Sequence, residues 1–298
     1  MNTTGLIIYS SFIAYLVFIN WLTYMLFRRD KHNARHNKER VSERHLLLCS
    51  WLGGALGARI AMKRLHHKTH HLKFRVVVPL ALLLWLFPFV SITAVFAMQT
   101  GPVFTTVFII HQQWKYGESF LDDSLQHKWV DYDQISPNMV RAVIASEDNL
   151  FQKHHGFSQR EIRQAWKEHK QGQVKHGGST ISQQTAKNVF TTGKRTWWRK
   201  ARETWYTVLI ETFWGKKRIM EVYLNVIEMG RGIYGAETAA QCYFRHSAKR
   251  LSPSEAAIIT AALPNPRVYS VMHPGPYMQR RQQQILNLMP KMGPINLE

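Results

Sequence analysis

The sequence predicts a mostly α-helical protein, with membrane-embedded helices in its N-terminal part and a larger helical domain after them. Long apolar segments fill the N-terminal part, and the remainder carries apolar residues at helical spacing between capping residues and glycines. No stretch shows the strict alternation of a half-buried strand. A hydrophobic content of 45% in 298 residues can fill a sizeable core, which excludes a disordered chain.

We expect residues 1–98 to form a membrane region with hydrophobic segments at 6–27, 46–62 and 76–98. The first and third segments are long enough to cross about 30 Å of hydrocarbon as helices. A cleavable signal peptide is the alternative for the first segment, but a basic n-region and a small-residue cleavage site are missing. The second segment is short and contains Arg59, so that it either spans the membrane or is re-entrant.

Two basic loops, Arg28–Arg44 and Lys63–Arg75, flank the second segment. Because basic loops stay in the cytoplasm, the loop before 76–98 sends the rest of the chain out of the cytoplasm. If 46–62 spans the membrane, the first loop lies outside; if it is re-entrant, both loops lie inside. We favour the second arrangement, which obeys the charge rule twice. The histidines of the second loop lack a carboxylate or cysteine partner, and we expect them to face lipid headgroups rather than a metal.

The net charge of +20 suits nucleic acid, anionic lipid headgroups or a phosphate-bearing substrate. The hydrophobic segments favour the membrane, and export of the remaining chain argues against nucleic acid. Two cysteines, Cys49 and Cys242, predict ordinary packing rather than a disulfide framework.

A connector is expected at 99–134 and a soluble helical domain at 135–293. Capping residues and terminating glycines or prolines divide this domain into helices. The expected helices run from Ser136 and Pro137 to Glu147, from the capping box Ser158–Glu161 to near Gly172, over 179–190, 195–214 and 216–228 with ends near Gly193, Gly215 and Gly230, and from the capping box Ser252–Glu255 to Pro264.

Five motifs in this domain combine acids, amides and cations with small residues. They are Glu147-Asp148-x-x-Phe151-x-x-His154-x-Gly156, Gly177-Gly178-Ser179-Thr180-Ile181-Ser182-Gln183-Gln184 with Lys187-Asn188, Arg199-Lys200-x-x-Glu203, Lys217-Arg218-Ile219-Met220-Glu221-Val222-Tyr223-Leu224-Asn225, and Arg231-Gly232-x-x-Gly235 leading to Tyr243-Phe244.

Two acids, Glu147 and Glu203, are the candidate catalytic residues. They are far apart in the sequence, and each lies among basic and amide residues. Such a pair suits sugar transfer, in which one carboxylate takes a proton and the other holds charge near the bond that breaks. His154 is expected either to orient the first motif through a hydrogen bond or to be a structural histidine.

The second motif predicts an anion site. Backbone N–H groups at a helix start, with the hydroxyls of Ser179 and Thr180, can donate to an anion; an ordinary N-cap is the alternative. Gln184, Lys187 and Asn188 lie three to four residues apart and hence near one helix face.

The third motif predicts a phosphate contact. Arg199 and Lys200 could bind a phosphate group, the first as a fork and the second as a point charge, and Glu203 shares their helix face. Trp197 and Trp198 lie just before them among basic residues, as is typical of a segment at a membrane interface.

In order and spacing, the five motifs closely resemble the glycosyltransferase family 51 domain of peptidoglycan synthesis, in the form of the monofunctional biosynthetic peptidoglycan transglycosylases. The resemblance covers residues 135–293 and implies a lysozyme-like all-helical fold. It implies an inner-membrane enzyme that polymerises lipid II into glycan strands on the periplasmic side and releases undecaprenyl pyrophosphate, with a part in cell-wall biogenesis and cell shape. Arg245 departs from the family, which usually has glycine after Tyr-Phe, and this departure puts a local turn in question.

The resemblance also implies roles for individual residues. Glu147 matches the general base, and Glu203 the second essential acid, which positions phosphate-binding groups or a divalent cation, magnesium or manganese, whose requirement stays open. The implied substrate-binding residues are Asp148, Phe151, His154, Ser179, Thr180, Gln184, Lys187, Asn188, Arg199, Lys200 and Arg231. The implied partners are lipid II, the growing glycan strand, membrane lipids and proteins of cell-wall synthesis or division.

Residues 5–90 resemble a small bacterial membrane family of unknown function, through Asp30-Lys31, Arg40 to Glu43, Gly53-Gly54, His67 to Thr69 and Lys73-Phe74. Two other functions compete with glycan synthesis. A lysozyme-like lytic enzyme would also be helical with a catalytic Glu, but it has no use for the cations of the second and third motifs. A non-catalytic membrane scaffold would not need the five ordered motifs. We expect no transpeptidase activity, because the chain given stops at Glu298.

Overall fold

Helices dominate the computed structural model, which describes residues 3–103, 106–116, 128–158, 163, 178–192 and 196–297. The chain divides into two units, Met1–Ala97 and Met98–Glu298, each considered by itself below. The mostly helical fold class is confirmed. The expected helix from Ser158 to near Gly172, with Glu161 of its capping box, lies almost wholly outside the described residues, as do Gly177 and Gly193.

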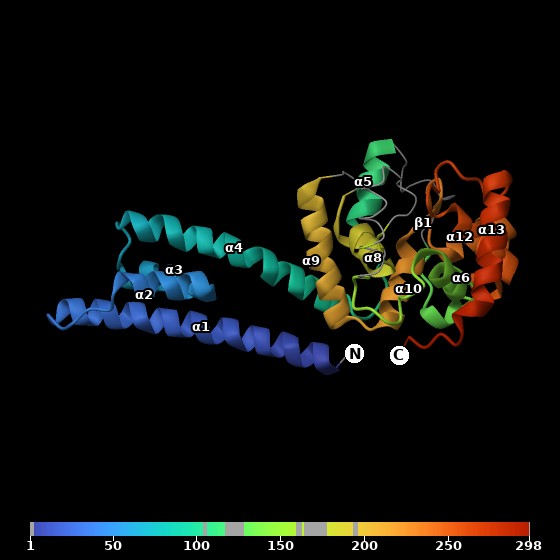
Figure 1. Cartoon of the computed structure of the whole chain (residues 1–298). Helices are drawn as coiled ribbons and strands as arrows, with labels where there is room; N and C mark the ends of the chain where they lie inside the picture. Colours follow the sequence, from blue (N-terminus) through green and yellow to red (C-terminus); the bar gives the residue numbers. More distant parts are fainter. Residues whose placement is uncertain are drawn as a thin grey trace. The chain divides into compact units, whose positions relative to one another are not determined.

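The first unit consists of helices (Figure 1). They are α1 (Thr3–Arg35), α2 (Glu43–Cys49), the π-helical turn η1 (Ser50–Gly54), α3 (Ala55–Leu65) and α4 (Leu72–Ala97). Among the described residues, Thr3–Arg35, Glu43–Leu65 and Leu72–Ala97 are long and apolar enough to cross a membrane. The expected segments 6–27 and 76–98 therefore form helices, and the first extends further into the basic loop. The middle segment is interrupted at Gly53, whose φ is 109°.

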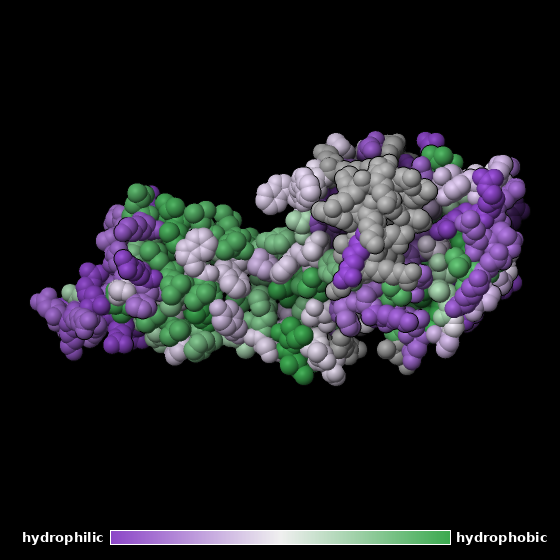
Figure 2. Space-filling model, viewed as in Figure 1, coloured by the Kyte–Doolittle hydropathy of each residue, from purple (hydrophilic) through white to green (hydrophobic). Residues whose placement is uncertain are grey.

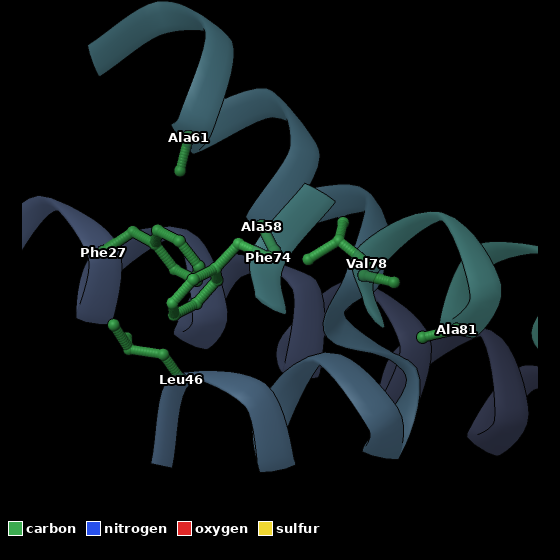
Figure 3. Close-up of a cluster of buried hydrophobic side chains, with 8 residues drawn as sticks. Phe27, Leu46, Ala58, Ala61, Phe74, Val78 and Ala81 are labelled. Carbon is green, nitrogen blue, oxygen red and sulfur yellow. The ribbon is translucent and has the colours of Figure 1, made fainter. Parts of the chain in front are cut away.

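A cluster of buried apolar side chains holds these helices together (Figure 3). Phe27 of α1 contacts Phe74 of α4 edge to face, with ring centroids 5.7 Å apart. Leu46 of α2 joins them, and Ala58 and Ala61 of α3 let the backbones approach closely. Each helix of the unit thus contributes to one core.

The second unit begins with a helix inside the expected connector, α5 (Val107–Tyr116), which packs against α8. Its other helices are α6 (Pro137–Glu147), α8 (Ile181–Phe190), α9 (Trp197–Phe213), α10 (Lys216–Val226), α11 (Ala236–Phe244), α12 (Pro253–Ala262) and α13 (Pro276–Leu288), with 3-10 turns at Tyr132–Gln134, Ala248–Arg250 and Met289–Met292. The Ser136 N-cap and the Ser252–Glu255 capping box are both present, as the sequence predicts.

Two groups of helices position the first two motifs. α8 packs against α9 and α10, whereas α6 packs against α12 and α13. α12 is buried along Ala256–Ala262, and its alanines allow close approach of its neighbours. α10 is likewise buried along most of its length. The ends of α6 and α8 that carry the motifs are therefore held by buried helices.

A short hairpin corrects the expectation that the domain has no strand. Helix α10 ends at Val226 rather than at 228, and β1 (Glu228–Gly230) then pairs antiparallel with β2 (Ile233–Tyr234). The N–H of Gly232, whose φ is 72°, donates to the Glu228 carboxylate at 3.1 Å. Strands this short give no alternating pattern in the sequence.

The turn after α11 keeps a left-handed residue where the resembled family has glycine. Arg245 has φ 58°, and its N–H donates to the carbonyl of Gln241. This conformation costs a residue with a Cβ about 1–2 kcal/mol relative to the right-handed region. The turn is therefore retained at an energetic cost.

We expect Arg245→Gly to stabilise the protein by about 0.5–1 kcal/mol, because glycine adopts positive φ freely but loses more entropy on folding. The thermal unfolding midpoint of the full chain in detergent should rise by roughly 2 °C. Lys249→Gly, in the adjacent 3-10 turn without positive φ, is the control and should lower the midpoint. An equal fall in both variants would show that Arg245 is not strained.

Candidate active site

Glu147 is the last residue of α6, where the chain leaves the helix through Asp148, whose φ is −162°. Its side chain is half-buried, and both oxygens have partners. The Ser146 hydroxyl donates to Oε1 at 3.3 Å, and Nε2 of Gln184 donates to Oε2 at 3.1 Å. The first and second motifs, far apart in sequence, thus meet at this carboxylate.

Tyr223 of α10 orients the amide that contacts Glu147. Its hydroxyl donates to Oε1 of Gln184 at 3.2 Å, which turns the NH₂ group of that amide towards the Glu147 carboxylate. Burial, reinforced by the negative charges of Glu147 and Asp148, raises the pKa of Tyr223 well above its ordinary value. The phenol therefore stays neutral and remains a donor.

A second buried network lies directly behind Glu147. The N–H of Gly156 donates to Nδ1 of His154 at 3.1 Å, so that Nε2 carries the proton and donates to the Asp148 carboxylate at 2.9 Å. Asp148 also accepts from the Ile181 N–H at 3.0 Å, and its side chain has no exposed surface. Phe151 is fully buried beside His154. This burial favours a positioning role for Asp148, Phe151 and His154 over direct contact with substrate.

Gly156 ends this motif because nothing larger fits. Its φ is 85°, and a Cβ there would lie 2.8 Å from Cγ2 of Thr207 on α9. The Gly156 carbonyl accepts from the Thr180 hydroxyl at 2.7 Å. The loop is therefore hydrogen-bonded to the N-cap of α8 and packs closely against α9.

The start of α8 is a capping box, as in the alternative of an ordinary N-cap, with Thr180 as the N-cap residue. Thr180 is the N-cap and accepts from the Gln183 N–H at 3.2 Å, while Oε1 of Gln183 accepts from the Thr180 N–H at 3.1 Å. With the Ile181 N–H bound to Asp148, these amides are all engaged within the protein. These three amides are not free to bind an anion, which favours cations as the donors of the predicted anion site.

Those cations gather around Glu203. Arg199 and Lys200 both form ion pairs with the Glu203 carboxylate, which is 3% exposed. Lys187 of α8, half-buried, interacts electrostatically with Glu203 and also with Glu147. The charge of Lys187 is thus coupled to both candidate acids.

Burial lowers the pKa of Lys187 from its ordinary value; Arg199 and Lys200 lower it too, whereas Glu203 and Glu147 oppose them. The cations of this cluster outnumber its two carboxylates. Such a site gains from binding an anion, which would favour the protonated form of Lys187.

The remaining candidate residues, Ser179, Asn188 and Arg231, differ in burial and in their partners. Ser179 is half-buried, and its carbonyl accepts from Nε2 of Gln184 at 3.3 Å. Asn188 is buried on α8. Arg231 is exposed in the turn between β1 and β2, and no contact among the described residues joins it to the cluster. The structure thus joins residues of the first, second and fourth motifs at Glu147 and Asp148, and leaves Arg231 apart.

The sequence analysis missed Arg281. This residue of α13 donates to the Ser146 hydroxyl at 2.9 Å and to the Ser146 carbonyl at 3.3 Å. With its lone pairs so engaged, the Ser146 hydroxyl can direct its proton to Glu147. No short-range pattern marks a residue this far along the chain, whereas Tyr223 lay inside a motif and could have been selected.

A resident divalent cation does not fit the described residues. No group of three or more His, Cys, Asp or Glu side chains among them could hold a metal ion. Glu203, the ligand the resemblance would suggest, already pairs with Arg199 and Lys200. Among the described residues, the chemistry of the site is therefore that of its side chains.

Two tryptophans project from the start of α9, beside the cation cluster. Trp197 is 92% exposed and Trp198 is 83% exposed. Neither packs into the core, which agrees with the expectation of an interfacial segment.

Fold and site together define a helical enzyme in which a carboxylate lies near a cluster of cations. A family model described as Transglycosylase matches residues 115–290, more than half of the chain. The chain belongs to this transglycosylase family. A second match, over residues 20–74, is to a protein family of unknown function (DUF1294), which confirms the expected N-terminal resemblance.

The matches to curated relatives cover most of each relative's length. A biosynthetic peptidoglycan transglycosylase of Bacteroides thetaiotaomicron is 47% identical over 208 residues, which are 69% of this chain and 84% of the relative. One from Xanthomonas campestris pv. campestris is 44% identical over 209 residues, 70% of this chain and 85% of the relative. One from Caulobacter vibrioides is 52% identical over 161 residues, 54% of this chain and 70% of the relative.

The hydrogen bond from Tyr223 gives a testable prediction. Tyr223→Phe should lower kcat about fivefold, because the Gln184 amide loses a bond worth about 1 kcal/mol and no longer holds one orientation against Glu147. Polymer formation from lipid II measures the effect. Tyr243→Phe is the matched control, since it also removes a phenolic donor, here a part-buried one, from a hydrogen bond to the Met229 carbonyl. Equal losses in the two variants would show a general effect on stability instead.

Proposed function

We propose that this protein is a biosynthetic peptidoglycan glycosyltransferase that polymerises lipid II into glycan strands and releases undecaprenyl pyrophosphate. Membership of the transglycosylase family and relatives named biosynthetic peptidoglycan transglycosylase support the reaction class. The observation that carries the assignment is that Gln184 of α8 donates to the Glu147 carboxylate, while the neighbouring helix α9 holds Arg199 and Lys200 in ion pairs with Glu203. Glu147 could then take the proton of the acceptor, and the cations could bind the leaving group of the donor.

In the proposed step, Glu147 takes the proton of an acceptor sugar hydroxyl as its oxygen attacks the anomeric carbon of the donor. The bond from that carbon to the pyrophosphate breaks, and its electron pair leaves with the pyrophosphate. Gln184 and Ser146 hold the carboxylate in place through their hydrogen bonds. Glu147 is the partly accessible acid of the pair, which suits it to receive the proton.

The developing charge on the pyrophosphate would be met by Lys187, Arg199 and Lys200. Glu203 is buried and pairs with Arg199 and Lys200 before any substrate arrives. It therefore acts by fixing those cations, so that little rearrangement is needed as the leaving group departs. Cations placed in this way are the feature that a hydrolase of finished glycan does not require, and the relatives are named for biosynthesis.

The substrate is anchored in a bilayer, and the protein has features that suit it. Apolar helices compatible with an inner-membrane anchor occupy the N-terminal unit. We assign the catalytic unit to the periplasmic side, because the basic loop before α4 favours the cytoplasm. Trp197 and Trp198 would enter the headgroup region near the site.

Glu147→Gln should abolish polymerisation, with a loss of about 10² to 10⁴ in rate, since an amide cannot take the proton. Detergent-purified full-length protein with labelled lipid II measures glycan polymer against hydrolysed fragments. Asp133→Asn, a change at an exposed carboxylate, should leave activity intact. Near wild-type turnover of the Gln variant would remove Glu147 from the base role, and fragments in place of polymer from the wild type would indicate a lytic enzyme.

Lys200→Ala should lower kcat/KM by roughly 10²-fold, because it removes a cation from the leaving group. Its effect on the free energy of unfolding should be only about 0–1 kcal/mol, since the side chain is partly exposed. Lys249→Ala, also an exposed lysine, is the activity control. If Lys200→Ala instead unfolds the domain while the folded fraction stays fully active, the residue is structural.

A further inference from the structure

The middle apolar segment of the first unit reverses direction at Gly53. Helix α2 ends at Cys49, the turn η1 follows, and α3 starts at Ala55. Gly53 has φ 109° and ψ −3°, which no α-helix contains. The segment is therefore two short helices rather than one span.

Both ends of this segment lie at the same level of α1. Nζ of Lys31, in α1, donates to the Leu65 carbonyl at the end of α3. Nζ of Lys68, three residues further on, pairs with Glu43 at the start of α2 at 2.6 Å. A segment that crossed the membrane would have its ends at opposite faces.

Asp30 links the two loops at this end. Its buried carboxylate accepts from Arg40 in the first loop at 3.3 Å and contacts Nε2 of His67 in the second loop at 2.7 Å. Both loops are thus held against the same turn of α1.

The turn itself lies beside a deeper part of α1 and α4. Asn20 Nδ2 donates to the Gly53 carbonyl at 2.9 Å, and the Tyr15 hydroxyl donates to the Leu52 carbonyl at 2.5 Å. Nε1 of Trp85, in α4, donates to the Trp51 carbonyl at 2.7 Å. Unpaired backbone groups in hydrocarbon cost several kcal/mol each, and these side chains satisfy the carbonyls that the break releases.

The depth of the turn follows from helix geometry. Asn20 and Lys31 are eleven residues apart on α1, or about 16 Å at 1.5 Å per residue. The hydrocarbon core is about 30 Å thick. The turn therefore reaches about the middle of the membrane before α3 returns.

We propose that Glu43–Leu65 is a re-entrant helical hairpin, and that the two basic loops form one cationic surface that binds anionic phospholipid headgroups. Figure 2 shows hydrophilic residues gathered at the end of this unit where α1 ends and α4 begins, beyond its hydrophobic sides. The exposed cations near this end are Arg28, Arg29, Arg35, Lys38, Arg40, Arg44, Lys63, Arg64, Lys73 and Arg75. Their number and their position at the edge of an apolar surface match negative headgroups.

Cysteine accessibility tests the hairpin. In a background with Cys49→Ser and Cys242→Ser, the single changes Glu39→Cys, His70→Cys and Met272→Cys place one thiol on each loop and one on the second unit. All three positions are exposed. An impermeant maleimide is applied to intact cells and, separately, after lysis.

The hairpin requires Glu39→Cys and His70→Cys to react alike and to differ from Met272→Cys. Labelling of Glu39→Cys together with Met272→Cys, but not of His70→Cys, would mean three spans and would overturn the proposal. The comparison between the two loops does not depend on the reaction, so that it stands or falls apart from the proposed function.

Lipid titration tests the cationic surface. Purified full-length protein in detergent is titrated with phosphatidylglycerol or phosphatidylcholine, and bound lipid is counted by native mass spectrometry. Neutralising Arg28, Arg29, Lys63 and Arg64 to Gln should weaken phosphatidylglycerol binding about tenfold or more. The same changes at Lys249, Arg250, Arg280 and Lys291, exposed cations of the second unit, are the control. Equal binding by both variants, or equal binding of both lipids by the wild type, would refute a headgroup surface here.

Discussion

A buried carboxylate, Asp148, is the constraint on which the catalytic unit depends. Without exposed surface, it must be hydrogen-bonded, because a buried carboxyl group without partners is costly. Its partners are His154 and the Ile181 N–H, so that satisfying it fixes the end of α6 against the start of α8. Glu147, the last residue of α6, lies at this junction, and its carboxylate therefore accepts from Gln184. The position of the proposed base is a consequence of how its neighbour is buried.

The same junction explains why the proposed site would bind an anion through side chains. A free helix start offers N–H groups to an anion, but here Asp148, Thr180 and Gln183 already engage the first amides of α8. Positive charge must then come from one turn further on, at Lys187, and from α9. Since Glu203 holds the α9 cations in advance, affinity for a pyrophosphate depends on ion pairs whose geometry is set during folding.

Local sequence patterns predicted most helices and two of their caps, whereas tertiary contacts determined the cap of α8 and the partners of Ser146. Ser136 and Ser252 were predictable caps because a hydroxyl followed by proline at the first helical position is a local pattern. Ser179 and Thr180 could each cap α8, and the hydroxyl that donates to the Gly156 carbonyl, distant in sequence, is that of Thr180. Arg281 reaches Ser146 across more than a hundred residues. Such choices depend on packing, which periodicity and spacing do not record.

In the first unit, too, buried polar groups must find hydrogen-bond partners, here in an apolar environment. Asp30 accepts from two loops as Asp148 accepts from two motifs, and Asn20, Tyr15 and Trp85 serve the carbonyls of the turn at Gly53. In hydrocarbon no water can replace a missing partner, so that the break at Gly53 is stable only while these side chains face it. In the proposed hairpin the middle segment adds no crossing, so that α1 and α4 would be the two crossings and the N-terminus would share a membrane side with the catalytic unit. In that arrangement the turn determines the side of the N-terminus, whereas α4 determines the side of the catalytic unit.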